Sequence, residues 1–210
     1  MKTKPPSVLI LSAGFSSRMG RLKANVRLHG TTFLDHILNL LPPEFPVFVV
    51  LGFQAETVRL HHPQFQGKWV ENPKFSEGMV SSLKAGLKAL SSSCPGVWIW
   101  PVDFPCLQVE TAKLLFQASL KAPNQIVVPS YHYRRGHPVY LPKQIFFEVE
   151  RLPNEAILRT ILFREPNDVL YINVEDSGVL ENFNTLADIQ HFQQKTSPQN
   201  FPQPRLQEEG

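Results

Sequence analysis

Short runs of consecutive apolar residues alternate along this chain with segments in which apolar residues recur at helical spacing. The runs lie at residues 7–11, 47–51, 97–100, 126–128 and 169–172. Continuous apolar runs of this length are typical of strands buried on both faces, as in parallel sheets. The helical segments lie at residues 33–41, after the N-cap candidate Thr32, and at residues 79–90 and 109–118. The alternation predicts an α/β fold: a single doubly wound, Rossmann-like, mostly parallel sheet with helices on both faces.

Length and composition indicate one globular domain. The chain has 210 residues, of which 42% are hydrophobic and 19% charged, and this is enough to bury a core. No linker is visible within residues 1–194, whereas residues 195–210 lack apolar periodicity and are predicted to form a disordered tail. No apolar run reaches the length of a membrane span, and two cysteines cannot form a disulfide framework. We therefore expect a cytoplasmic protein with no membrane partner.

Positive charge is concentrated near the beginning of the sequence. The net charge is only +3, but residues 1–34 hold six lysines and arginines and no carboxylate. Such a segment suits a polyanion, either a compact triphosphate or an extended RNA, and a solvated surface is the simpler alternative. RNA binding is the least favoured interpretation, because few aromatic residues accompany these cations.

A loop rich in small residues follows the first predicted strand. This glycine loop, Leu11–Lys23, has glycines at positions 14 and 20 and places Arg18 and Lys23 among small residues. Backbone N–H groups in such a turn can surround phosphate oxygens, and the two cations can neutralise them. The spacing matches neither a Walker A loop nor a dinucleotide fingerprint. A strand–helix connection with solvated cations is the alternative.

The glycine loop resembles the signature of nucleotidyltransferases of the molybdenum-cofactor type, and four further segments match that family in the same order. The resemblance covers nearly all of residues 7–192. It implies the fold of the nucleotide-diphospho-sugar transferases and an Mg²⁺-dependent transfer of a nucleoside monophosphate, with release of pyrophosphate. The four further segments are residues 77–83, 103–107, 135–139 and 176–185.

The resemblance also assigns roles to individual residues. The glycine loop binds the triphosphate, Arg18 and Lys23 act on its phosphates, and Asp103 holds Mg²⁺ with help from Asn184. Arg135 and His137 lie in the segment expected to contact a phosphate-bearing acceptor. The catalytic residues are thus Arg18, Lys23 and Asp103, and the nucleotide-binding residues are Leu11, Ser12, Ala13, Gly14, Arg18, Lys23 and Ser81.

Elementary chemistry supports some of these roles and offers alternatives. Asp103 follows the apolar run at residues 97–102, so its carboxylate faces the crevice at the strand ends and can bind Mg²⁺; it could instead cap the next helix. Ser81 lies at a predicted helix start, where N–H groups bind phosphate. The alternative there is a helix capped by Ser76, with Met79 packed in the core.

The segment around Asn184 departs from part of the family, since cytidylyltransferase relatives usually have an aspartate at this position. An amide oxygen attracts a hard dication more weakly than a carboxylate does. Thr185 with Asp188 also matches a capping box, whatever the function. His137 could equally be a loop histidine with a satisfied hydrogen bond, and we expect the pair His61–His62 at the surface and Cys106 in packing.

The segments that resemble the family favour different nucleobases. Ala13 and residues 135–138 resemble cytidylyltransferases, whereas the asparagines at 182 and 184 resemble guanylyltransferases, so CTP is favoured over GTP. The resemblance makes molybdopterin or its molybdenum-loaded form the acceptor. Two alternatives stay open: transfer to a sugar phosphate or another small phosphate, and a catalytically weak nucleotide-binding factor for the maturation of a molybdoenzyme.

Overall fold

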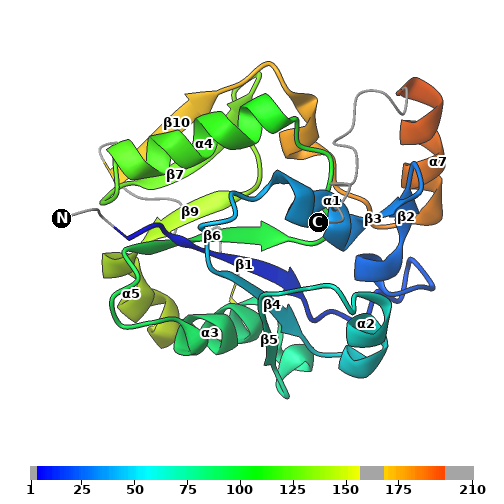
Figure 1. The fold of residues 1–210 in the computed structure, drawn as a ribbon, viewed down its shortest axis with the longest axis horizontal. Coiled ribbons are helices and arrows are strands. Elements are labelled where there is room, and N and C mark those ends of the chain that lie inside the picture. The colour runs from blue at the N-terminus through cyan, green and yellow to red at the C-terminus, as the bar shows by residue number, and fades with distance from the viewer. Residues whose placement is uncertain (1–3, 157–167, 197–210) are drawn as a thin grey trace, which may run out of the picture.

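A twisted sheet forms the centre of the computed structural model, which describes residues 4–156 and 168–196 (Figure 1). Its strand order is β10 (Val169–Asn173), β7 (Ile126–Tyr131), β9 (Val139–Pro142), β6 (Gly96–Pro101), β1 (Ser7–Ser12), β4 (Val47–Leu51) and β5 (Lys68–Glu71), with β8 (Arg134–Arg135) paired to β7. Strands β9 and β8 run antiparallel to their neighbours, and the other pairings are parallel. The predicted mostly parallel α/β sheet is confirmed.

Helices cover both faces of the sheet because successive side chains of each central strand point to opposite faces. Val8 and Ile10 of β1 pack with α1 (Phe33–Leu40) and α4 (Val109–Lys121). Leu9 and Leu11 pack with α3 (Met79–Ala89) and α5 (Phe146–Arg151) on the other face. The two layers are seen above and below the sheet in Figure 1.

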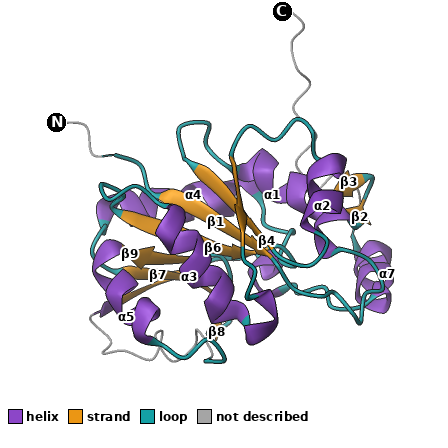
Figure 2. Cartoon of the chain, turned by 90° about the horizontal axis from the view of Figure 1, so that it is seen from below, coloured by secondary structure: helices purple, strands orange, loops and turns teal. Residues whose placement is uncertain are grey.

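Smaller elements gather beyond the carboxyl ends of β1 and β6. Figures 1 and 2 both show α7 (Leu186–Lys195) beside the hairpin of β2 (Arg27–Leu28) and β3 (Thr31–Thr32), near α1. Short 3₁₀ turns at Lys23–Asn25 and Phe75–Glu77 and helix α2 (Ala55–His61) complete this end, and two more 3₁₀ turns lie at Lys143–Ile145 and Ser177–Leu180. A crevice at this end is what a doubly wound sheet predicts.

Helix caps test several of the sequence predictions. The Thr32 side chain accepts a hydrogen bond from Asp35 N at 3.0 Å, so the predicted N-cap of α1 is confirmed. The Thr185 capping box is confirmed as well. The capping roles for Ser76 and Asp103 are wrong, because α3 begins after Gly78 and α4 after Gln108.

The C-terminal boundary differs slightly from its prediction. Helix α7 includes Lys195 and is followed by Thr196 as its C-cap. The rest of the predicted tail, residues 197–210, lies outside the described residues. Within the described parts of the chain, no helix has both the length and the apolar composition needed to span a membrane.

Candidate active site

A pocket of about 430 Å³ opens at the carboxyl ends of β1 and β6. The glycine loop forms one wall, and the segment after β6 and the turn before α7 contribute polar groups. The start of α3 completes the lining. The lining residues are Leu11, Ser12, Ala13, Gly14, Phe15, Ser16, Ser17, Arg18, Lys23, Phe75, Ser76, Gly78, Met79, Ser82, Pro101, Val102, Asp103 and Asn184.

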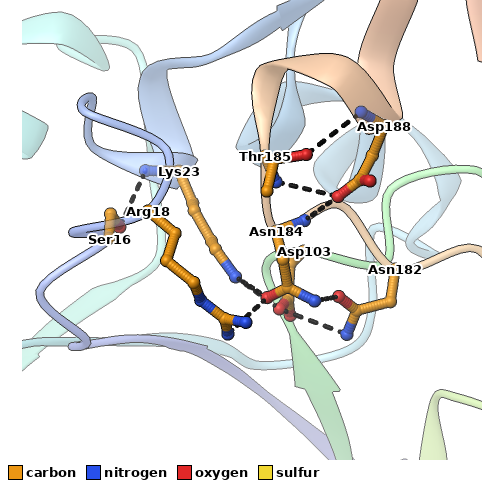
Figure 3. Close-up of polar contacts among 8 residues, drawn as sticks. All are labelled: Ser16, Arg18, Lys23, Asp103, Asn182, Asn184, Thr185 and Asp188. Atoms are coloured by element: carbon orange, nitrogen blue, oxygen red, sulfur yellow. Dashed lines mark hydrogen bonds and ion pairs between the residues drawn. The ribbon is translucent and has the colours of Figure 1, made fainter. Parts of the chain in front are cut away.

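Lys23 contacts other polar side chains on one side of the pocket. Its Nζ donates to Asp103 Oδ2 at 2.7 Å and to Asn184 Oδ1 at 2.9 Å (Figure 3). The Lys23 and Asp103 side chains are 18% and 17% exposed. The fold thus brings together three predicted site residues that are far apart in the sequence.

A chain of amides fixes the orientation of Asn184. Arg18 donates from Nη2 to Asn184 Oδ1 at 3.4 Å, and Asn184 Nδ2 donates to Asn182 Oδ1. Asn182 Nδ2 in turn donates to Asp103 Oδ2 at 3.3 Å. Because its nitrogen is engaged in this way, the amide oxygen of Asn184 faces the same position as the carboxylate of Asp103 (Figure 3).

Backbone contacts hold this turn against the sheet. Phe183 N donates to the backbone oxygen of Asp103 at 3.0 Å, and the Phe183 ring is buried. Asn184 N and Thr185 N each donate to Asp188 Oδ2 at 2.8 Å. These two backbone hydrogen bonds lower the pKa of Asp188 below its ordinary value. The capping box of α7 therefore also positions Asn184.

The donor set suits a magnesium ion that arrives with a polyphosphate. A carboxylate oxygen and an amide oxygen already face one cationic group, the Lys23 ammonium. In the described residues no cluster of three or more histidine, cysteine or acidic side chains could hold a metal. Mg²⁺ is commonly held by one or two carboxylates together with substrate phosphates and water.

The glycine loop is tied to both strands beside β1. Val102 N donates to Leu11 O at 3.1 Å, and Phe53 N donates to Ala13 O at 3.2 Å. Within the loop, Met19 is buried, whereas Gly14 and Arg18 are exposed to the pocket. The loop therefore has a fixed base and an accessible rim, as a phosphate-binding turn requires.

Ser81 is not brought to this pocket. Its hydroxyl is buried, lies 2.8 Å from Lys74 O and 2.7 Å from Gly78 O, and accepts from Asn72 Nδ2 at 2.9 Å. These contacts fix the turn before α3. Ser82, the next residue, is the one that lines the pocket.

Arg135 and His137 also lie away from the pocket lining. His137 is half-buried with its Nδ1 atom shielded from solvent, its ring centroid lies 4.6 Å from that of Phe104, and desolvation lowers its pKa to about 4. The guanidinium of Arg135 lies 5.0 Å from the centre of the exposed Tyr171 ring. Acceptor contact by either residue stays a prediction.

Several side chains lie elsewhere than the sequence analysis expected. Met79 was expected in the core, but it is 49% exposed and lines the pocket. His62 was expected at the surface, but it is 5% exposed and contacts Asp35 Oδ1 and Asn25 Oδ1, each at 3.1 Å. Cys106 is buried, and burial raises its pKa, as expected for a packing residue.

Phe15 and Phe75 are pocket residues that the sequence analysis missed. Phe15 is 50% exposed and is flanked in the loop by the small residues Gly14 and Ser16. An aromatic residue among small residues could have marked Phe15 as a candidate site residue from the sequence. Phe75 carries no local signal, because the rings that it contacts, Phe15 and Phe53, come from other parts of the chain.

The fold, with its pocket at the strand ends, is the one expected of an α/β enzyme that transfers a nucleotidyl group. Residues 8–169 match the model of the MobA-like NTP transferase domain, and the chain belongs to this family of nucleotidyltransferases. The resemblance seen in the sequence is therefore confirmed.

Curated relatives agree with this assignment, and solved structures share the fold. The chain is 24% identical to the molybdenum cofactor cytidylyltransferase of Escherichia coli K12, over 86% of this chain and 91% of that protein. It is 25% identical to a probable molybdenum cofactor guanylyltransferase of Mycobacterium ulcerans, over 86% of this chain and 90% of that protein. A crystal structure from Mycobacterium tuberculosis H37Rv has the same fold, with a TM-score of 0.77 and 22% identity over 92% of this chain and 100% of that one. The structure of a manganese complex from the same organism has a TM-score of 0.73 and is 20% identical, over 91% of this chain and 100% of that one.

Proposed function

We propose that this protein is an Mg²⁺-dependent molybdenum cofactor nucleotidyltransferase that transfers CMP, in preference to GMP, from the triphosphate to a molybdopterin-type acceptor. The observation that carries the proposal is the contact of Lys23 with Asp103 and Asn184 at the rim of the glycine loop. It joins a phosphate-binding cation to a pair of metal-binding oxygens in one pocket. The names of the two curated relatives support the acceptor.

Some residues of the pocket bind the phosphates, and others neutralise the charge that develops during transfer. The rim of the glycine loop and Arg18 hold the outer phosphates. The flexible stem of Lys23 lets its ammonium reach an oxygen of the α-phosphate, where negative charge must be stabilised during transfer. The acceptor's phosphate is the nucleophile and pyrophosphate leaves, so catalysis needs positioning and no protein nucleophile.

A bound Mg²⁺ would neutralise phosphate charge and polarise the phosphoryl group, held by Asp103 and Asn184. The manganese complex of the mycobacterial neighbour supports a divalent cation in this fold. The single carboxylate of this pair makes the site weak until the nucleotide's phosphates contribute further oxygens.

The preference for CTP rests on Ala13. This residue is only 4% exposed and lines the pocket one residue before Gly14, so its methyl group narrows the space available to a base. A smaller pyrimidine is favoured by such a restriction. The discrimination expected from one methyl group is modest, about 1–3 kcal/mol.

Pyrophosphate release tests the proposal. The purified chain is incubated with Mg²⁺, each of the four nucleoside triphosphates and molybdopterin, and CTP is expected to give the fastest release. Turnover with a sugar phosphate in place of molybdopterin would favour the broader nucleotidyltransferase alternative. Binding of CTP, detected as a rise in melting temperature, without turnover on either acceptor would favour the maturation factor.

A further inference from the structure

Three phenylalanines from three separate loops meet on one side of the pocket. The ring centroid of Phe15 lies 5.4 Å from that of Phe53 and 5.1 Å from that of Phe75, with interplanar angles of 49° and 63°. Phe53 and Phe75 are half-buried and 6.4 Å apart, and Phe15 is 50% exposed. We call Phe15, Phe53 and Phe75 the aromatic cluster. Its distances are those of favourable ring pairs, so the two partners hold the Phe15 ring in place.

The aromatic cluster lies on the opposite side of β1 from the polar groups. Phe53 follows β4 and Phe75 follows β5, whereas Asp103 follows β6, and the order of these strands is β6, β1, β4, β5. Adjacent strands are about 4.8 Å apart. The pocket therefore runs from a polar end at Asp103 to an aromatic end near Phe75, with the glycine loop between them.

Phe75 of the cluster packs on the backbone at Gly52, which lies beside the glycine loop. A Cβ atom at Gly52 would lie 2.5 Å from the Phe75 side chain and 2.6 Å from the carbonyl oxygen of Ala13. No side chain fits there, so the missing Cβ lets Phe75 approach the loop. Met79 extends the apolar surface, since it lines the same pocket and is half exposed.

Phosphate binding does not explain an exposed aromatic ring within the glycine loop. An apolar surface beside a phosphate site suits the heteroaromatic ring carried by the same ligand, because rings attract one another at these distances. We propose that Phe15, held by Phe53 and Phe75, forms the surface on which the nucleobase of the bound triphosphate stacks. This inference rests on the proposed function and names a further residue for nucleotide binding.

Stacking on Phe15 has a specific consequence for affinity. An aromatic face attracts any base, so Phe15 raises the affinity for a nucleotide over that for a bare polyphosphate without choosing between cytosine and guanine. Loss of base–aromatic stacking weakens binding by about 5- to 150-fold. Ala13, where the glycine loop leaves β1, acts separately on the choice between cytosine and guanine.

The test compares CTP with inorganic tripolyphosphate, which carries the phosphates and no base. Isothermal titration in Mg²⁺ measures both ligands with the parent, Phe15→Ala, Phe15→Leu and Phe15→Tyr. Tyr133→Ala is the matched control, since Tyr133 is a fully exposed aromatic residue at the β7–β8 turn. We expect Phe15→Ala and Phe15→Leu to lose about 5- to 150-fold in CTP affinity and less than about twofold in tripolyphosphate affinity, with Phe15→Tyr and Tyr133→Ala like the parent.

Other outcomes overturn the inference. An equal loss for both ligands in Phe15→Ala would mean that the ring only shapes the loop, and unchanged CTP affinity would mean that the base lies elsewhere. A raised KM for the acceptor with unchanged CTP affinity would place the acceptor on the ring. A parent protein that binds CTP through Phe15 but transfers no nucleotide would contradict the proposed function and leave the inference standing.

Discussion

Replacement of Lys23 separates catalysis from folding, because its ammonium faces the pocket and not the core. Lys23→Ala removes the donor to Asp103 Oδ2 and Asn184 Oδ1. Asp103 keeps the hydrogen bond from Asn182, and the vacated space opens into the 430 Å³ pocket, which water can enter. The pair is largely shielded from bulk solvent, but it opens on the pocket, so the free energy of unfolding should fall by about 1 kcal/mol, the upper end of the range for exposed ion pairs.

The effect of Lys23→Ala on transfer should be much larger. The transition state loses a cation beside the α-phosphate, and removal of one such group costs on the order of a hundredfold or more in rate. A hundredfold corresponds to about 2.7 kcal/mol, well above the expected loss of stability. Lys23→Arg should not restore the rate, because a planar guanidinium cannot replace a point charge that lies between two oxygens.

The assay measures initial rates of pyrophosphate release at saturating CTP, together with urea unfolding of each variant. Lys121→Ala is the control, since Lys121 is an exposed lysine at the end of α4. A folded Lys23→Ala variant that turns over within a few-fold of the parent would refute the reasoning. A loss of stability as large as the loss of transition-state stabilisation would show that Lys23 acts mainly in the fold.

Four further results are expected. Ala13→Gly should shift the ratio of kcat/KM for CTP and GTP toward GTP by roughly tenfold or more, and equal ratios in both proteins would place the base away from Ala13. Asp103→Asn should abolish Mg²⁺-dependent release of pyrophosphate, and retained activity would require another metal ligand. Asn184→Asp should tighten Mg²⁺ binding to the nucleotide complex in isothermal titration, and unchanged affinity would leave Asn184 with a purely structural role. The N–H groups of Asn184 and Thr185 lower the pKa of Asp188, so this carboxylate stabilises the fold above its unfolded pKa, and that stabilisation is lost as the pH falls through its folded pKa. Asp188→Asn should therefore reduce the dependence of the unfolding free energy on pH between about pH 2 and 5, measured by urea unfolding.

The central strands could be predicted from the sequence because burial on both faces leaves an uninterrupted apolar signature. All five apolar runs are strands, with ends within three residues of the prediction. The missed strand β5 lies at the edge of the sheet, where Lys68 and Glu71 are exposed and interrupt any apolar run. The missed strand β9 is only four residues long and pairs antiparallel with β6, so neither length nor alternation marks it.

The polar half of the site follows from the sequence more readily than the aromatic half. Lys23 and Asp103 each occupy a position with its own signal, a glycine-rich turn and a strand end, and the sheet topology brings these positions together. Phe53 and Phe75 occur in loops without such a signal, and only the order of the strands places them beside Phe15. The error at His62 has the same origin, since its partners lie in α1 and in the turn after Lys23.

The amide at Asn184 changes the charge balance of the pocket in a direction that suits its ligand. Arg18 and Lys23 both donate to its oxygen, and Asp103 is the carboxylate that shares Lys23 with it. Two cations thus face one anion, and a carboxylate at position 184 would cancel the remaining positive charge. Under the proposed function, that surplus favours binding of a triphosphate and weakens the attraction for a free dication. The proposed function therefore predicts that metal and nucleotide affinity are coupled: the excess positive charge binds the nucleotide, and the nucleotide's phosphates supply the metal-binding charge that the amide of Asn184 lacks.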